Sequence, residues 1–235
     1  MRGISNKMSY KPMQGKTAIV TGGAGGIGKA ISIKLAQSGG NVVIFGRDIE
    51  KGESTVEVIK SSGGNASFFR TDLAVDKEIE SSLGQVLNDF GHVDILVNNA
   101  AVSGYMGPIV ETPIKEVENV LKINLISIFY LCKLVLPKMI ENEFGRIINI
   151  SSVAYRKSPP NSATYNISKG GLNILTMTLS KEVASHGITV NAVAPGLVLT
   201  ERIIKSRIPG MAEKKGISQE AMMKELTAGT DTGRL

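Results

Sequence analysis

Three residues in the second half of the chain have the side chains and the spacing for proton transfer to an oxygen atom. Tyr165 and Lys169 are four positions apart, and Ser152 precedes Tyr165 by thirteen. If the segment is helical, Tyr165 and Lys169 share one face, so the ammonium lies beside the phenol and favours its ionised form. The spacing therefore predicts an activated tyrosine, although a solvated lysine beside a half-buried ring has the same spacing.

A glycine-rich segment near the N-terminus has the composition of a phosphate-binding turn. It reads Thr21-Gly22-Gly23-Ala24-Gly25-Gly26-Ile27-Gly28 and follows the apolar run Thr17–Val20. Apolar residues then recur at helical spacing from Ile27 to Leu35, so the order is strand, turn, helix. Glycines in such a turn let backbone N–H groups and the helix N-terminus approach a pyrophosphate. A flexible surface turn is the alternative, because the spacing differs from the Gly-x-Gly-x-x-Gly fingerprint.

The remaining elements alternate between strands and helices, which predicts an α/β fold. Further strands are expected at 42–45, 66–70, 94–97, 146–150 and 189–194, and helices at 53–61, 76–90, 114–143 and 163–185. Continuously apolar strands between amphipathic helices indicate a doubly wound parallel sheet of the Rossmann type. We expect one domain over 16–235, preceded by an N-terminal extension at 1–15. The candidate residues then lie after strands, at the edge where such sheets bind ligands.

Composition narrows the function classes. The 235 residues carry a formal net charge of +6, but Lys and Arg are scattered, so nucleic-acid binding is not expected. One cysteine excludes a disulfide framework and fits a reducing compartment. No metal site is expected. The polar, basic start and the absence of an uninterrupted apolar run of bilayer length indicate a cytoplasmic protein without membrane contact.

Seven features in order resemble the short-chain dehydrogenase/reductase family, in particular its 3-oxoacyl-acyl carrier protein reductases. They are Thr21–Gly28, Asp72-Leu73, Asn98-Asn99-Ala100, Asn124, Ser152, Tyr165 with Lys169, and Pro195-Gly196-x-x-x-Thr200. The resemblance implies an NAD(P)-dependent oxidoreductase that interconverts a small-molecule carbonyl compound and a secondary alcohol. It also implies a homo-oligomer.

The same resemblance implies roles for individual residues. Tyr165 would be the general acid and base, Ser152 would polarise the substrate oxygen, and Lys169 would bind the nicotinamide ribose. Asn124 would hold a water that links Lys169 to solvent, although an asparagine in an apolar helix is as often a satisfied core group. Ser151 competes with Ser152, but strand alternation turns the two side chains in opposite directions. The implied cofactor-binding residues are Gly22, Gly26, Ile27, Gly28, Arg47, Asp72, Leu73, Asn98, Ala100, Tyr165, Lys169, Pro195, Gly196, Val198 and Thr200.

The end of the second strand indicates which cofactor is preferred. An acidic residue there binds the ribose 2′-hydroxyl of NAD, whereas arginine accommodates the 2′-phosphate of NADP. The acidic position falls on Gly46 and is followed by Arg47, so NADP(H) is favoured over NAD(H). Asp48 leaves the alternative open, since its carboxylate could face the ribose or cap the next helix.

Two features differ from the family pattern. Residues 199–223 combine Ile and Met with basic residues, which suits either an adaptable apolar substrate lid or a surface helix packed on the body. The sequence ends at Leu235, where family members usually add a helix and a seventh strand, so the sixth strand is expected at an exposed edge. A catalytically silent dinucleotide-binding module and a truncated fragment are therefore the alternatives to an active enzyme.

Overall fold

Six parallel strands form one sheet in the structure, a computed structural model that describes residues 11–229. The strand order is β3-β2-β1-β4-β5-β6, and every neighbouring pair is parallel. This is the predicted doubly wound sheet. The strands are β1 Thr17–Thr21, β2 Asn41–Gly46, β3 Asn65–Arg70, β4 Ile95–Asn98, β5 Gly145–Ile150 and β6 Ile188–Val193.

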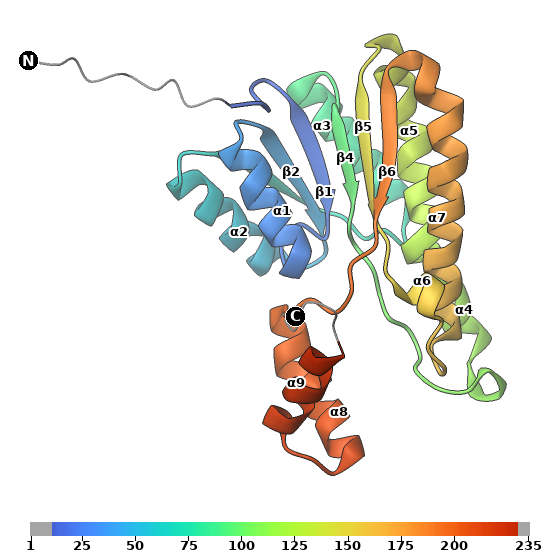
Figure 1. The fold of residues 1–235 in the computed structure, drawn as a ribbon. Coiled ribbons are helices and arrows are strands. Elements are labelled where there is room, and N and C mark those ends of the chain that lie inside the picture. Colours follow the sequence, from blue (N-terminus) through green and yellow to red (C-terminus); the bar gives the residue numbers. More distant parts are fainter. Residues whose placement is uncertain (1–10, 230–235) are drawn as a thin grey trace, which may run out of the picture.

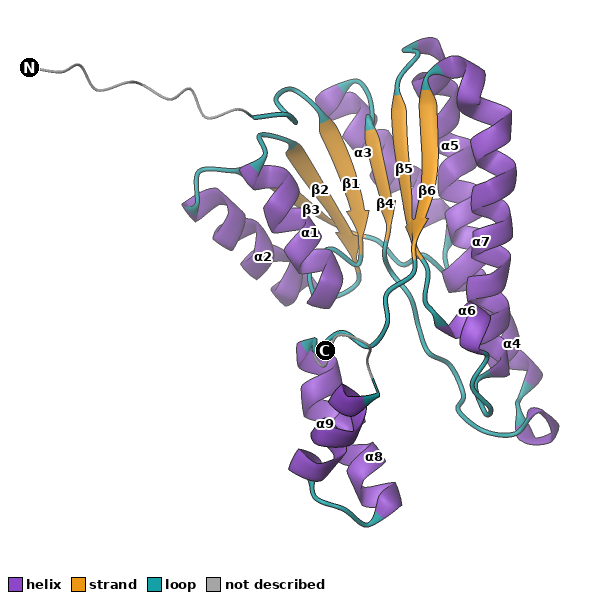
Figure 2. Cartoon of the chain, in the orientation of Figure 1, coloured by secondary structure: helices purple, strands orange, loops and turns teal. Residues whose placement is uncertain are grey.

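Helices connect the strands and cover the sheet (Figures 1 and 2). The α-helices are α1 Gly26–Gln37, α2 Ile49–Ser61, α3 Asp76–Phe90, α4 Ile114–Leu121, α5 Ser127–Glu141, α6 Ala154–Lys157, α7 Ala163–Val183, α8 Ile208–Lys215 and α9 Gln219–Ala228. Short 3-10 turns are η1 Ile109–Glu111 and η3 Ala184–His186, and π turns are η2 Lys122–Ile126 and η4 Ile203–Arg207.

The core has two layers because strand side chains alternate between the faces of the sheet. One layer joins the sheet to α3, α5 and α7, and includes Ile19, Phe45 and Leu131. The other joins it to α1 and α2, and includes Val20, Ile44 and Ile59. The central strands are therefore buried on both faces, which explains their continuous apolar runs.

The chain reverses direction across the sheet between β1 and β4, which are neighbours. Open α/β sheets bind ligands beyond the carboxyl ends of their strands, next to such a switch point. The glycine-rich segment and the turn after β5 both emerge at this edge. Helices α8 and α9 lie beyond the same edge (Figure 1).

The predicted single helix over 114–143 is interrupted in the structure. It consists of α4, the π turn η2 and α5, with Asn124 inside the π turn. This stretch, Ile114–Glu141, is long and apolar enough to cross a membrane by length and composition, and its most apolar 18-residue window has a mean hydropathy of 1.7. In the fold, 44% of the most apolar window is buried, and Leu131, Val135 and Met139 pack in the core. The apolarity of α5 thus matches its place against the sheet.

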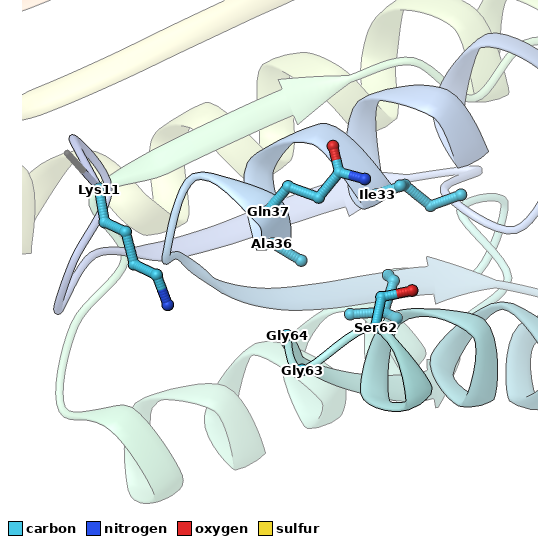
Figure 3. Close-up of a pocket in the computed structure, with 8 residues that line it drawn as sticks. Lys11, Ile33, Ala36, Gln37, Ser62, Gly63 and Gly64 are labelled. Carbon is cyan, nitrogen blue, oxygen red and sulfur yellow. The ribbon is translucent and has the colours of Figure 1, made fainter. Parts of the chain in front are cut away.

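A pocket of about 170 Å³ lies away from the carboxyl edge (Figure 3). It is lined by the C-terminal ends of α1 and α2 and by Lys11, from the predicted N-terminal extension. Within that extension, residues 12–15 form turns, and the partly buried Met13 packs against the core. Residues 1–10 lie outside the described part of the chain. Since α1 begins at the glycine-rich segment and ends here, this pocket is separate from the candidate active site.

Candidate active site

The glycine-rich segment forms a tight turn between β1 and α1. Gly26 has a φ of +51°, which favours glycine, and a Cβ there would lie 3.1 Å from Thr200 Cγ2. A Cβ on Gly28 would come within 2.3 Å of the Gly22 carbonyl oxygen. The N-cap of α1, Gly25, offers no side-chain acceptor to the first-turn N–H groups. These amides at the start of a 12-residue helix therefore suit an anionic group.

Asn99 fixes this turn from β4. Its Nδ2 donates to the carbonyl of Thr21 at 2.9 Å and to that of Gly22 at 3.2 Å. The Thr21 hydroxyl accepts from the backbone N–H groups of Asn99 and Ala100, both at 3.0 Å. Sequence reasoning assigned roles to Asn98 and Ala100 but none to Asn99. Two consecutive asparagines directly after a predicted strand are the pattern in the sequence that could have pointed to Asn99.

Asn98 points away from the turn and into the protein. Only 1% of it is exposed, and its Nδ2 donates to Asn149 Oδ1 at 2.9 Å. Asn149 in turn donates to Thr176 Oγ1 at 2.8 Å, which joins β4, β5 and α7. Because its side chain is committed here, Asn98 can meet a ligand at the carboxyl edge through its backbone.

Ser151 and Ser152 follow β5 and have different environments. Ser151 is buried and contacts α7, whereas Ser152 is half-buried and accepts a hydrogen bond from the Ala154 N–H at 3.1 Å. The turn that carries Ser152 is tied to the loop after β6, since the Val153 N–H donates to the Pro195 carbonyl at 3.1 Å. Ser152 is thus the serine whose hydroxyl is available at the edge.

Tyr165 and Lys169 lie one turn apart on α7, as their spacing predicts. Lys169 Nζ is 5.8 Å from the centroid of the Tyr165 ring and donates to the Ile150 carbonyl at 2.7 Å. Lys169 is only 2% exposed, and its burial lowers the pKa of the ammonium to about 8. A lysine on a strand-facing side of a helix is expensive to bury, so its placement indicates a function rather than a solvated surface pair.

Asn124 is fully buried in the π turn. Its Oδ1 accepts from the Val102 N–H, and its Nδ2 donates to the Val102 carbonyl, both at 2.9 Å. The same Nδ2 lies 3.1 Å from Ser168 Oγ, next to Lys169 on α7. The side chain therefore joins the loop after β4 to α7, which is what a satisfied polar core group does.

The loop from Pro195 to Thr200 crosses over the glycine-rich turn. Pro195 is tied to Val153 on one side, and the Thr200 methyl group faces Gly26 on the other. Gly196 and Val198 between them are exposed. This loop brings the glycine-rich turn and the Ser152 turn to one site.

The end of β2 carries a cation beside the end of β3. Arg47 is 61% exposed at its side chain, and its Nη1 lies 3.9 Å from Asp72 Oδ2. Asp72 also accepts from the Ala74 N–H at 2.9 Å, and Leu73 is buried. Asp48 caps α2: it accepts from the Lys51 N–H at 3.1 Å and pairs with Lys51 Nζ at 2.9 Å. The capping interpretation of Asp48 is therefore the one the structure supports.

Other reactive groups in the described part of the chain lie outside this site or are blocked. Cys132 is buried in the core, and desolvation raises the pKa of its thiol to about 12. Among residues 11–229, no group of three or more His, Cys, Asp or Glu is placed to hold a metal ion.

The chain matches known dehydrogenases over most of its length. Residues 16–208 match the short chain dehydrogenase family. D-beta-hydroxybutyrate dehydrogenase of Rhizobium meliloti is 37% identical over 90% of this chain and 82% of the relative. The 3-oxoacyl-[acyl-carrier-protein] reductase of Staphylococcus epidermidis is 36% identical over 79% of this chain and 76% of the relative.

Solved structures of proteins with similar sequences have the same fold. NAD+-bound xylitol dehydrogenase has a TM-score of 0.88 and 30% identity, and the match covers 95% of this chain and 88% of that one. A variant of actinorhodin polyketide ketoreductase with NADPH has a TM-score of 0.88 and 33% identity, over 93% and 84% of the two chains. With the sheet order, the glycine-rich turn and the Ser152, Tyr165 and Lys169 arrangement, these matches show that the chain belongs to the short-chain dehydrogenase/reductase family of oxidoreductases.

Proposed function

We propose that this protein interconverts a ketone and a secondary alcohol with NADP(H), and that Tyr165 is the general acid and base. The observation that carries the proposal is the buried Lys169 ammonium beside the Tyr165 ring, at the edge where Ser152 follows β5. A cation held there without a carboxylate partner among the described ion pairs is free to stabilise a phenolate.

The proton chemistry follows from the charge that develops on the substrate. When bound at this edge, the reduced nicotinamide would supply a hydride to the carbonyl carbon, so negative charge would develop on the carbonyl oxygen. Tyr165 donates its phenolic proton to that oxygen, while the Ser152 hydroxyl donates a hydrogen bond to it. Lys169, with a pKa of about 8, is largely protonated at neutral pH and stabilises the phenolate that remains. In the direction of alcohol oxidation, the phenolate takes the proton back.

Asn124 completes the proposed relay from Lys169 to solvent. Its side chain is already bonded to Val102 and Ser168, so a water would be held by its backbone. The π turn supports this role, because regular helix pairing is interrupted there and such turns are frequent at functional sites.

The carboxyl edge fits a dinucleotide. The uncapped first turn of α1 provides N–H groups for the pyrophosphate, with Gly22, Gly26, Ile27 and Gly28 close to it. By the family resemblance, Asp72 and Leu73 would lie at the adenine and the backbones of Asn98 and Ala100 at the ribose. Tyr165 and Lys169 would bind the nicotinamide ribose. The carboxamide would meet the crossing loop, at Pro195, Gly196, Val198 and Thr200.

The charges after β2 support NADP(H) over NAD(H). Arg47 is exposed there, whereas the Asp48 carboxylate is engaged with Lys51 at the start of α2. A guanidinium is suited to a 2′-phosphate, and the carboxylate that would bind a free 2′-hydroxyl is turned elsewhere.

The segment after Thr200 supports an apolar substrate group. It forms a separate apolar cluster around Ile208, Ala212 and Met222 beyond the carboxyl edge. Tyr155, Val198 and Ile204 are exposed on elements next to the site. We propose a 3-oxoacyl thioester as the substrate class, in agreement with the name of the staphylococcal relative.

Exposed apolar side chains on α5 and α7 support assembly with a second copy of this chain. Ile167, Ile174 and Met177 on α7 are each more than half exposed and recur at intervals of seven and three. Ile126 at the end of η2 and Phe129 at the start of α5 are also exposed, and α5 covers the same face of the sheet (Figure 1). Because an isologous dimer uses the same patch on both subunits, we propose that these exposed side chains pack against the same side chains of a second copy across a two-fold axis.

Purified protein, NADPH and a panel of ketones and 3-oxoacyl thioesters test the proposal. Loss of absorbance from NADPH that depends on one of these substrates is expected. Cofactor binding without turnover across the panel would instead favour the silent dinucleotide-binding module.

A further inference from the structure

Asn173 makes two short hydrogen bonds between α7 and the end of β5. Its Nδ2 donates to Ser151 Oγ at 2.7 Å and to the Lys169 carbonyl at 2.6 Å. Ser151 Oγ lies 3.4 Å from the same carbonyl and can donate to it. These three groups, which we call the Asn173 clamp, form a closed ring in which each hydrogen has an acceptor.

The clamp holds the residue directly before Ser152. Ser151 is 4% exposed, and its N–H donates to the Val193 carbonyl at 2.7 Å. On the other side of Ser152, the Val153 N–H is tied to Pro195. The backbone at Ser152 is therefore held between two anchored neighbours, and the side-chain anchor on Ser151 comes from α7. The Ser152 hydroxyl itself accepts from the Ala154 N–H at 3.1 Å.

The same clamp bonds α7, the helix that carries Tyr165 and Lys169. Asn173 lies one turn beyond Lys169 and two turns beyond Tyr165 on α7. It accordingly connects the helix that carries the proposed proton donor to the turn that carries the hydroxyl acting on the same oxygen. In the proposed reaction, Tyr165 and Ser152 must both reach the substrate oxygen, so a small change in the distance between them would lower the rate.

A general role in joining α7 to β5 does not require Asn173. Thr176 already bonds Asn149 at 2.8 Å, fully within the core, one turn further along the same helix. The hydrogen bonds of Thr176 and Asn173 differ in the residue that they reach. Thr176 bonds Asn149 inside β5, whereas Asn173 bonds Ser151, which follows β5 and directly precedes Ser152.

We propose that Asn173 is a positioning residue, which acts through Ser151 and Lys169 to fix the Ser152 hydroxyl relative to Tyr165. This inference rests on the proposed function, since it concerns the geometry of that reaction. The Asn173 side chain does not titrate near neutral pH, so it is not a proton donor or acceptor in the reaction, and its proposed contribution is geometric.

Four variants test the clamp. Asn173→Asp keeps the shape but loses both N–H donors, Ser151→Ala removes the other partner, and the double variant closes a cycle. Thr176→Val is the matched control, because it breaks the other tether between the same two elements. For each we would measure kcat, KM for both substrates, thermal unfolding, and hydrogen–deuterium exchange of the peptide covering 151–154.

In Asn173→Asp and in Ser151→Ala we expect kcat to fall about ten- to a hundredfold while both KM values change little. The double variant should lose no more than the worse single variant, because both remove one interaction. Exchange at 151–154 should rise in all three. Thr176→Val should unfold at a lower temperature yet keep the wild-type kcat and the wild-type exchange at 151–154.

Wild-type kcat and exchange in the two single variants would overturn the proposal, as would independent, multiplicative losses in the double variant. An equal loss of kcat in Thr176→Val would reduce Asn173 to a stability role. If Asn173→Asp does not fold, Ser151→Ala carries the test. A wild-type protein that turns over none of the carbonyl panel would refute the proposed function, whereas exchange at 151–154 would still support or refute the clamp.

Discussion

Among single residues, the buried Lys169 carries most of the argument for the proposed proton chemistry, because its ammonium lies beside the Tyr165 ring. A buried ammonium is costly unless something nearby needs positive charge, and the Ile150 carbonyl satisfies only one of its three N–H donors. The Tyr165 ring lies within reach of its field. The spacing in the sequence predicted that Lys169 and Tyr165 lie together. The burial of Lys169 results from the packing of α7 on β5, which a local sequence pattern does not predict.

The pKa of Lys169 predicts how stability varies with pH. In the folded protein it is about 8, below the ordinary 10.5. Between these values the unfolded chain binds a proton that the folded chain lacks, so this group makes unfolding costlier as the pH rises. Urea unfolding of cofactor-free protein at the two ends of this window should give a change in unfolding free energy that is more positive in the wild type than in Lys169→Met. Equal pH slopes for the two proteins would contradict the assigned burial.

Arg47 carries the prediction on cofactor preference. Arg47→Ala should weaken NADPH binding by about tenfold or more, since a charge-assisted bond to phosphate is lost. NADH lacks that phosphate and is the internal control, so its affinity should change little. Fluorescence titration with both cofactors measures this difference, and equal losses would refute the role of Arg47 at the 2′-phosphate.

At the scale of elements, the strands and most helices follow from hydrophobic pattern and the π turn does not. The sequence predicted one helix over 114–143, because the apolar residues continue through Asn124. The interruption depends on Val102, a residue from another loop that takes both polar ends of the Asn124 amide. Asn173 was missed for the same reason: its partner Ser151 is distant in sequence. Side chains that bond across elements are the part of the site that local reasoning could not recover.

The turn between β1 and α1 predicts opposite effects for two glycine substitutions. Gly28→Ala places a Cβ 2.3 Å from the Gly22 carbonyl oxygen and should destabilise the protein by about 1–3 kcal/mol, with loss of cofactor binding. Gly84 lies inside α3 with open space around it, so Gly84→Ala should stabilise by about 1 kcal/mol. Chemical denaturation of both variants checks the contrast, and a neutral Gly28→Ala would show that the turn is not close-packed.

If the exposed apolar residues of α5 and α7 form the contact between two copies, a charge placed among them should dissociate the oligomer. Phe129 is 56% exposed on α5, and Phe129→Glu would place a charge in the proposed contact, which should shift the protein to a smaller species. Val58, 41% exposed on α2 at the other face, gives the matched control Val58→Glu. Sedimentation velocity distinguishes them. If both variants keep the wild-type mass, these residues are not the interface.

At the scale of the whole molecule, the fold was predictable because one principle governs it. Continuous apolar strands must be covered on both faces, and the crossover connections then fix a parallel sheet with its ligand edge at the carboxyl ends. In the described sheet β6 pairs with β5 alone. The position of α8 and α9 was not predictable, because their small apolar cluster is separate from both layers of the core.

Tyr165→Phe removes the hydroxyl proposed to donate the proton and leaves the ring in place. NADPH oxidation with a substrate that the wild-type enzyme reduces should fall by about 10²–10⁴-fold, while NADPH affinity, measured by fluorescence, stays unchanged. Near-normal turnover by Tyr165→Phe would show that a group other than Tyr165 is the proton donor.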